Sequence, residues 1–469
     1  MLLTSSSYFV FLIAIFLLYW PLARFRAASL AVLLLANYFF YAKWGLFYLA
    51  LIPAASFVDY LIGLGLGAAK VHWKRRALVS ASVVMNLGIL ATFKYMPFFL
   101  GAWGGLMGQK PPAWHWTFPL GISFYCFQSL TYTIDLYRKD GKPVRSLLAH
   151  MTAVSFFPTT LSGPITRVLA LAPQLEKPGR QLAAADAGRA LFRIGLGLFK
   201  KFLIADYLAE NLVNRVFDTP GLYTGAETLI GVYGYALQLY YDFSGYTDIA
   251  IGSALLLGLK LPENFNRPYQ SLNIAEFWRR WHITLSNWLR DYLYFSLPGL
   301  RSKWRLFTYM NLFVTMLLGG LWHGANWTFI IWGALHGGAL AVQHGWRTAR
   351  GNPRPPQQFW RRLGPSLLTA HFVTFAWIWF RASSIENANE VLGRIGSMSV
   401  AFDNISAGVV VVMAVALLGH FTPQKWSNWT AGRFADAPFY AQAAVLALLV
   451  MVIEYLSMTG AAPFLYTQF

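Results

Sequence analysis

Two histidines in this chain of 469 residues have surroundings that could support chemistry. The first is His323, in the apolar segment 316–338, beside Gly319, Gly320 and Gly324. An ionisable residue in a run fit for lipid is costly and usually faces a cavity or a partner. The glycines remove side-chain bulk, so a substrate or another helix can come close to the imidazole. A neutral imidazole is a competent general base, although a histidine hydrogen-bonded between packed helices has the same pattern.

The second histidine, His282, lies in the more polar segment 261–299, which does not resemble a membrane span. Asn273 stands three positions before Glu276, as at the start of a helix with a capping box. Apolar residues then recur at spacings of four and three and form one helical face: Phe277, Trp281, Leu285, Trp288 and Tyr292. This pattern also fits an amphipathic helix that lies in a membrane interface.

The composition indicates which kind of protein must position these residues. Apolar residues make up 57% of the chain and charged residues 12%, about half of the roughly 25% that soluble domains carry. The formal net charge of +19 comes from short basic clusters between apolar runs, as membrane topology favours, and does not indicate nucleic acid. The single cysteine, Cys126, excludes an internal disulfide and is interpreted as a core residue. We therefore expect an all-α polytopic membrane protein.

Apolar runs of about 20 residues predict 10 to 13 crossings of the bilayer. The expected spans are 8–23, 27–42, 46–68, 77–100, 118–136, 190–212, 226–241, 245–260, 306–321, 326–343, 366–380, 408–421 and 440–457. Residues 151–172 carry two prolines and a glycine, which suits a re-entrant or broken segment. We expect one integral domain over 1–469, with the catalytic core region at 118–345.

Basic residues cluster in alternate loops, which predicts that those loops are cytoplasmic and that the N-terminus lies outside. The first apolar run lacks the basic flank and cleavage site of a signal peptide, so we expect it to be retained. The predicted location is the bacterial inner membrane, with the N-terminus in the periplasm.

Several long motifs resemble the membrane-bound O-acyltransferase family, and most closely its bacterial branch of alginate O-acetyltransferases. The stretches RPYQSLNIAEFWRRWHITLSNWLRDYLY and GGLWHGANWTFIIWG carry the histidines. Three further stretches also resemble the family and occur in the family's order: PLGISFYCFQSLTYTIDLYR, FFPTTLSGPITR and YYDFSGYTDIAIGSALLLG. The resemblance covers nearly the whole chain. It implies a ring of tilted helices around a thinned central region, with a cytoplasmic funnel for acyl-CoA.

The resemblance also implies roles for the two histidines. His323 matches the membrane-embedded histidine that is treated as catalytic, and we expect it to remove the proton from the acceptor hydroxyl. His282 matches the second signature position and is expected to orient the donor or relay a proton. Because 41 residues separate them, they must come from different helices that meet.

Further residues are candidates for binding the substrate or the donor. Trp322, Asn326 and Trp327 are expected to line the site, with Asn326 as a possible donor to the developing oxyanion. Three arginines are candidates for binding the phosphates of CoA: Arg279, Arg280 and Arg290. Contact with lipid headgroups or helix packing explains their presence equally well. Asp242 and Asp248 either line the tunnel or pair with an internal Arg or Lys.

Acetyl-CoA is the expected donor, no cofactor is expected to be bound, and no His, Asp or Glu spacing resembles a metal site. The resemblance further implies a polysaccharide acceptor and a periplasmic acetyltransferase partner of the SGNH type, since the chain has no Gly-x-Ser-x-Gly elbow of its own. Two alternatives stay open. One is transfer of D-alanine, or acylation of a lipid or a protein, by the same fold. The other is a transporter for the polysaccharide or the donor.

Overall fold

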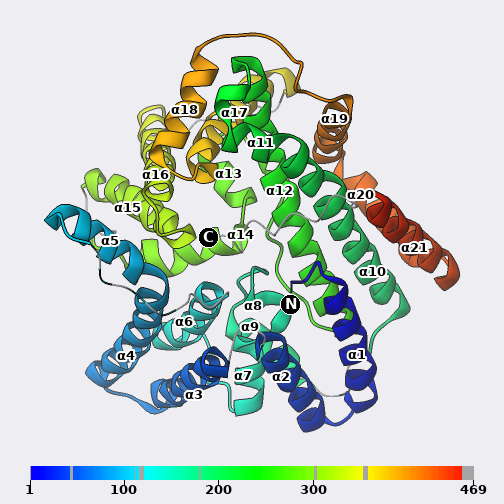
Figure 1. Cartoon of the computed structure of the whole chain (residues 1–469). Coiled ribbons are helices and arrows are strands. Elements are labelled where there is room, and N and C mark those ends of the chain that lie inside the picture. The colour runs from blue at the N-terminus through cyan, green and yellow to red at the C-terminus, as the bar shows by residue number, and fades with distance from the viewer. Residues whose placement is uncertain are drawn as a thin grey trace. The chain divides into compact units, whose positions relative to one another are not determined.

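The computed structural model describes residues 2–42, 46–110, 112, 114, 116, 121–177, 179, 181–299, 304–351 and 358–456. Within these residues the chain forms helices and no β-strand (Figure 1), which confirms the all-α class. Contacts divide the chain into two compact units. Unit 1 comprises residues 1–194, 246–262 and 434–437, and unit 2 comprises 195–245, 263–433 and 438–469. The expectation of a single domain with its core at 118–345 stays a prediction.

Unit 1 is built on the N-terminal helices. They are α1 (Ser6–Leu22), α2 (Arg26–Ala42), α3 (Leu46–Ala68), α4 (His72–Leu90), the π-turn η1 (Ala91–Tyr95), α5 (Met96–Met107), α6 (Ile122–Arg138), α7 (Leu147–Val154), α8 (Phe157–Thr160) and α9 (Val168–Glu176). Helices α3, α4 and α6 lie side by side (Figure 1). Cys126, on the almost completely buried α6, is itself buried, which confirms its interpretation as core. The residues directly before α6, 117–120, lie outside the described residues.

Residues 151–172 form a broken segment, as their prolines and glycine predict. Helix α7 ends at Val154, the single turn of α8 follows, and α9 starts only at Val168. The turns between them satisfy their own polar groups. Thr160 Oγ1 donates to the carbonyls of Ser155 and Phe156, each at 2.9 Å. Nearly the whole stretch is buried, so non-helical backbone here lies within protein rather than in lipid.

An acidic residue lies inside unit 1 on an otherwise apolar helix. Asp59 on α3 is completely buried. Its carboxylate accepts hydrogen bonds from Ser82 Oγ at 2.6 Å, from Asn86 Nδ2 at 2.9 Å and from Ser129 Oγ. Neutral donors from α4 and α6 therefore stabilise this carboxylate, and the three helices are tied together by it.

Unit 2 contains the central and C-terminal helices. They are η2 (Phe199–Asp206), η3 (Ala209–Val213), α11 (Asn214–Asp218), η4 (Pro220–Leu222), η5 (Pro268–Gln270), α13 (Ile274–Arg280), α14 (Ile283–Trp288), η6 (Leu289–Leu293), η7 (Tyr294–Ser296), α15 (Arg305–His323), α16 (Trp327–Ala349), α17 (Phe359–Arg381), α18 (Ile385–Gly396), α19 (Ala407–Phe421) and α21 (Phe439–Leu456). The boundaries of the units fall within three helices: α10 (Ala184–Leu198), α12 (Gly225–Leu256) and α20 (Gln424–Asp436).

The prediction of separate spans at 226–241 and 245–260 is wrong, because both belong to the single helix α12 of 32 residues. The polar residues in its middle suggest a break from the sequence alone, but they have partners in the fold. Asp242 pairs with Lys201, and Asp248 pairs with Arg193. Gly245 allows the backbone of Gly197 to come so close that a Cβ would lie 2.8 Å from its carbonyl oxygen. The helix therefore continues through the polar stretch.

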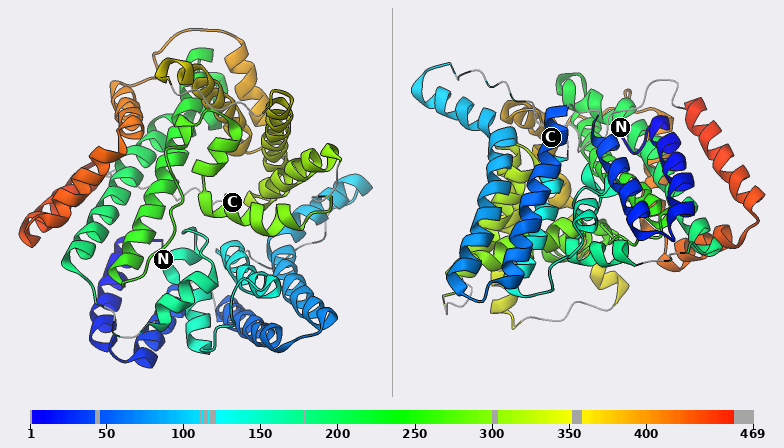
Figure 2. Two further views of the ribbon diagram at one scale, coloured as in Figure 1. Left: turned by 180° about the vertical axis from the view of Figure 1, so that it is seen from behind. Right: turned by 90° about the horizontal axis from the view of Figure 1, so that it is seen from below.

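Four helical stretches in the described part of the chain are long and apolar enough to cross a membrane: Leu49–Ala68, His72–Met107, Trp360–Arg381 and Phe439–Leu456. The last of these, drawn red in Figure 2, buries none of its apolar window inside the protein, as expected of a helix that faces lipid. Helices α19 and α20 are bent by 95° and could form a fifth span together. The chain is a multi-pass membrane protein, and the count of 10 to 13 crossings stays a prediction.

Helices α15 and α16 pack with their backbones almost in contact. A Cβ on Gly333 would lie 2.5 Å from the carbonyl oxygen of Met316, and one on Gly337 would lie 2.9 Å from the Cα of Phe313. Gly320 faces Gly333 from the other side of the seam. Small residues permit such close helix packing in membranes. This helical hairpin carries His323 at the end of its first helix.

We predict that Gly333→Ala destabilises the protein by about 1–3 kcal/mol, because the added methyl group forces the two backbones apart. The matched control is Gly338→Ala on the same helix, where a Cβ would meet no atom within 4 Å. There alanine should be neutral or stabilise by up to about 1 kcal/mol through its helix propensity. The midpoint of thermal unfolding in detergent measures both changes. Equal midpoints for the two variants would contradict the close packing.

Candidate active site

His323 is the last residue of α15 and is 4% exposed. Aromatic rings surround its imidazole. Its ring centroid lies 5.0 Å from that of Trp322, 5.2 Å from Trp332 on α16 and 5.2 Å from Phe380 on α17. The helix ends directly after it because Gly324 turns to an extended conformation at the C-cap. His323 is thus held at a helix end, shielded from bulk water by aromatic side chains.

His282 lies where the predicted continuous helix over 273–292 is broken. Helix α13 ends at Arg280, and α14 starts at Ile283. Between them His282 adopts a left-handed conformation with φ 39° and ψ 57°. The loop before the helices pairs with backbone groups freed by the break, since the N–H of Ile283 donates to the carbonyl of Asn264 at 2.9 Å. The apolar face is nonetheless buried within unit 2, and the position of this segment in a membrane interface stays a prediction.

Asn264 determines which nitrogen of His282 carries the proton. The Oδ1 atom of Asn264 accepts from the Thr284 hydroxyl at 2.6 Å and from the Thr284 N–H at 3.4 Å, which identifies it as the amide oxygen. His282 Nδ1 lies 3.2 Å from the same oxygen and must therefore donate to it. In the neutral ring the lone pair then resides on Nε2. His282 is completely buried, with Phe243 edge-on at a centroid distance of 4.7 Å.

Trp322 lies close to both histidines. Its ring centroid is 6.4 Å from that of His282 and 5.0 Å from that of His323. The fold therefore brings together two histidines that are 41 positions apart in sequence, as the site prediction requires. Trp322 is 5% exposed, so its side chain is buried together with the two histidines.

Asn326 and Trp327 differ in their surroundings from Trp322. Asn326 caps α16, because its Oδ1 accepts from the N–H of Thr328 at 3.1 Å, while its Nδ2 donates to the carbonyl of Ser383 at 3.3 Å. Trp327 begins α16 and is 54% exposed. The described contacts do not place either residue against the imidazole of His323. Their roles in lining the site and in stabilising an oxyanion stay predictions.

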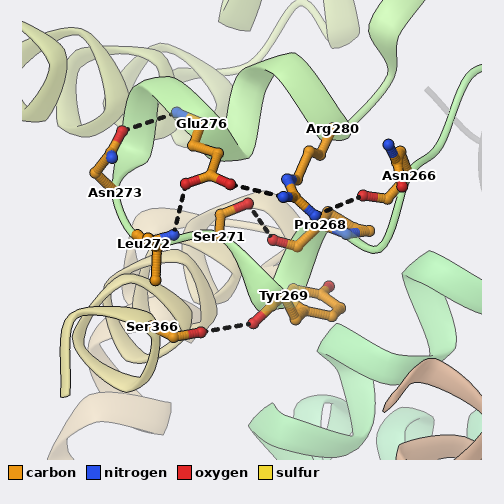
Figure 3. A network of polar contacts seen from close by, with 9 residues as sticks. All are labelled: Asn266, Pro268, Tyr269, Ser271, Leu272, Asn273, Glu276, Arg280 and Ser366. Carbon is orange, nitrogen blue, oxygen red and sulfur yellow. Dashed lines mark hydrogen bonds and ion pairs between the residues drawn. The ribbon is translucent and has the colours of Figure 1, made fainter. Parts of the chain in front are cut away.

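Arg280 takes part in a polar network that starts α13 (Figure 3). Asn273 Oδ1 accepts from the N–H of Glu276 at 2.9 Å, and Glu276 Oε2 accepts from the N–H of Leu272 at 3.1 Å, which confirms the predicted helix start. Arg280 Nη2 pairs with Glu276 Oε1 at 2.7 Å, and its Nη1 donates to the carbonyl of Asn266. The guanidinium of Arg280 is thus already committed to holding the loop against the helix.

The other two arginines are more accessible. Arg279 is exposed on the face of α13 away from its apolar stripe. Arg290 is also exposed, and its Nε pairs with Asp291 Oδ1 at 2.7 Å. This hydrogen bond raises the pKa of the Arg290 guanidinium, which therefore stays charged. Binding of CoA phosphates by any of the three arginines stays a prediction, and Arg279 is the one whose position suits it best.

Asp242 and Asp248 on α12 each have a basic partner. Lys201 Nζ lies 2.9 Å from Asp242 Oδ1 and 2.7 Å from Asp206 Oδ1, and the lysine is only 2% exposed. In unit 1, Asp248 Oδ1 accepts from Arg193 Nε at 2.9 Å. This is the ion-pair alternative that the sequence left open for both residues. Their role in lining a tunnel is a prediction that no contact here tests.

Sequence reasoning missed several residues of this site. Asn264 orients His282 from a loop without any periodic signal. Trp332 and Phe380 pack on His323 from two further helices. Lys201 neutralises Asp242, and its only sequence signal is a basic pair within an apolar run. His336 on α16 also lies among aromatic rings, and its Nδ1 accepts from Trp278 Nε1 at 3.3 Å.

Comparisons with known proteins show the family of this chain. The model of the membrane-bound O-acyltransferase family matches residues 79–385. A protein named probable alginate O-acetylase AlgI from Azotobacter vinelandii is 37% identical over 99% of both chains. A protein of the same name from Pseudomonas putida is 41% identical over 84% of this chain and 80% of its own. A peptidoglycan O-acetyltransferase from Helicobacter pylori is 36% identical over 80% of this chain and 75% of its own.

We predict that Lys201→Met destabilises the protein strongly, by about 3–5 kcal/mol, because it leaves two buried carboxylates without their shared cation. Asp242→Asn should cost much less, since Lys201 keeps Asp206 as its partner. Thermal unfolding of both variants in detergent tests this order. If Asp242→Asn proved the more damaging of the two, the lysine would not be the centre of this cluster.

Proposed function

Because this chain belongs to the membrane-bound O-acyltransferase family and is an O-acyltransferase, we propose that it transfers an acetyl group from acetyl-CoA towards an exopolysaccharide such as alginate. The observation that carries the proposal is that His323 and His282 are both buried and both lie close to the ring of Trp322. Relatives named for alginate and for peptidoglycan acetylation support an acetyl group and a polymeric acceptor.

His323 acts as the general base in the proposed reaction. It takes the proton of the attacking hydroxyl as the hydroxyl oxygen forms a bond to the acyl carbon, and the carbonyl π pair moves onto the carbonyl oxygen. That pair returns when the carbon–sulfur bond of the thioester breaks. The leaving thiolate then takes the proton from His323. Burial among aromatic rings excludes water, which would otherwise hydrolyse the thioester.

His282 serves as a hydrogen-bond acceptor through Nε2, because Asn264 holds the proton on Nδ1. A lone pair held in this way can orient a donor group of the substrate or accept a proton in a relay. Arg279 is the arginine we assign to the phosphates of acetyl-CoA, since it is exposed and lies in the last turn of α13, three positions before His282.

The chain lies in the inner membrane with its N-terminus in the periplasm, takes the acetyl group from the cytoplasmic side, and passes it to a periplasmic acetyltransferase of the SGNH type. The orientation is inferred from the basic loops, and the relay from the absence of a nucleophile elbow in the sequence.

Addition of the periplasmic partner to the reconstituted protein should increase label transfer to polysaccharide. No increase would remove the relay from the proposal.

Replacement of the proposed base tests the reaction directly. His323→Ala, in lipid with radiolabelled acetyl-CoA, should lower CoA release and label transfer about 10²–10⁴-fold, the contribution of a positioned general base. His344→Ala is the matched control, because His344 is an exposed histidine on α16 that packs only on Tyr309 in the described contacts. Equal turnover by His323→Ala and wild type would remove His323 from the chemistry. Binding without thioester cleavage by the wild type would favour a transporter.

A second test concerns the donor. Arg279→Ala should raise the KM for acetyl-CoA about tenfold, the effect of about 1.4 kcal/mol of phosphate binding, with little change in kcat. The KM for acetylpantetheine, which lacks the nucleotide phosphates, should stay unchanged. Arg280→Ala should instead lower the unfolding temperature, because Arg280 holds Glu276 and Asn266. An equal rise in KM for both donors would contradict the assignment of Arg279.

A further inference from the structure

The base at His323 needs a counterpart that stabilises the carbonyl oxygen of the acyl group, and the described contacts offer candidates on α16. Attack of the acceptor oxygen on the acyl carbon moves the π pair onto the carbonyl oxygen, which then carries negative charge. Asn326 already uses its oxygen for Thr328 and donates from its nitrogen to Ser383. A donor that is buried near His323 and lacks an acceptor within the protein is a better match.

His336 has such a donor, and its tautomer follows from its neighbour. Trp278 Nε1 lies 3.3 Å from His336 Nδ1. An indole N–H can only donate, so Nδ1 must carry a lone pair and the proton of the neutral ring resides on Nε2. His336 is completely buried, and among the residues that the structure describes none accepts a hydrogen bond from its Nε2.

Trp332 supplies a second donor of the same kind. It lies four residues before His336 on the same face of α16, with ring centroids 4.8 Å apart. Its side chain is 1% exposed, and no described residue accepts from its Nε1. The same indole packs perpendicular to the ring of His323 at 5.2 Å. Trp332 therefore places one buried N–H without a described acceptor against the proposed base, and His336 places a second one beside the ring of Trp332.

A buried donor without an acceptor costs about 1–3 kcal/mol, so two of them side by side call for a ligand atom that accepts both. A carbonyl oxygen has two lone pairs and fits this requirement. We infer that Trp332 Nε1 and His336 Nε2 donate to the carbonyl oxygen of the transferred acyl group. The inference rests on the proposed acyl transfer and names the groups that hold the oxyanion. Neither group gives up its proton, since both only stabilise the pair of electrons that moves onto oxygen and returns to carbon.

Two variants of His336 separate this role from a purely structural one. The oxygen of an asparagine side chain can take the place of Nδ1, so His336→Asn keeps an acceptor for Trp278 and removes the donor at Nε2. A glutamine side chain reaches the place of Nε2, so His336→Gln keeps a donor there and removes the acceptor for Trp278. The two roles therefore predict opposite orders of activity.

We expect His336→Asn to lower kcat about 10²–10³-fold, as loss of one oxyanion donor does. His336→Gln should stay within about tenfold of wild type, since it keeps a donor. Turnover is measured with the full chain in lipid and radiolabelled acetyl-CoA. Ethyl-CoA, which has no carbonyl group, should inhibit wild type and His336→Asn with the same inhibition constant, because the lost contact is to the carbonyl oxygen alone.

Several results would overturn the inference. One is a kcat of His336→Asn equal to that of wild type. The others are an equal loss of kcat in both variants, or a greater loss in His336→Gln. Such results are expected if His336 only packs against Trp278 or points its N–H at an aromatic face. Trp332→Phe provides an independent check, because it removes the second donor and keeps an aromatic ring. Its kcat should fall about 10²-fold, and an unchanged kcat would exclude Trp332. Absence of turnover by wild type would instead count against the proposed function itself.

Discussion

The close approach of α15 and α16 is the constraint on which the site depends. Gly320, Gly333 and Gly337 let the two backbones touch, so that no side chain separates the helices along the seam. A wider separation would move His323, at the end of α15, away from Trp332 on α16, and with it the aromatic enclosure of the imidazole. In lipid, where association of helices gains little from the hydrophobic effect, such backbone packing is also a principal source of stability.

Neighbouring groups determine which ring nitrogen carries the proton in His282 and in His336. Asn264 presents an oxygen that can only accept, so His282 keeps its proton on Nδ1 and a lone pair on Nε2. Trp278 presents an N–H that can only donate, so His336 keeps its proton on Nε2. Nε2 of His282 is therefore a hydrogen-bond acceptor, whereas Nε2 of His336 is a donor. The difference arises from one hydrogen bond in each case and needs no ionised ring.

Buried carboxylates in the apolar helices also depend on neighbouring groups. Asp242 and Asp206 share Lys201, Asp248 pairs with Arg193, and Asp59 accepts from three neutral donors. Each arrangement satisfies a carboxylate that would otherwise be buried alone at a prohibitive cost. The same pairing explains why α12 continues through a polar stretch where the sequence predicted two separate spans.

The sequence by itself determined the class of protein and the pair of histidines. Few charges, abundant apolar residues and basic clusters between apolar runs permit only a helical membrane protein, because a soluble chain could not cover its surface with so few charges. His323 among glycines, the capping box at Asn273 and the broken segment 151–172 are local signals, since each depends on residues a few positions apart. The structure agrees with all three.

Only the tertiary structure decided which groups surround the histidines. The break at His282 depends on a loop residue, Asn264, 18 positions earlier, and the enclosure of His323 depends on Phe380, from a different helix. Helical periodicity carries the apolar stripe through position 282 unchanged, so it contains no signal for the break. Partners far apart along the chain are selected by packing, and packing is a property of helices in contact rather than of any one segment.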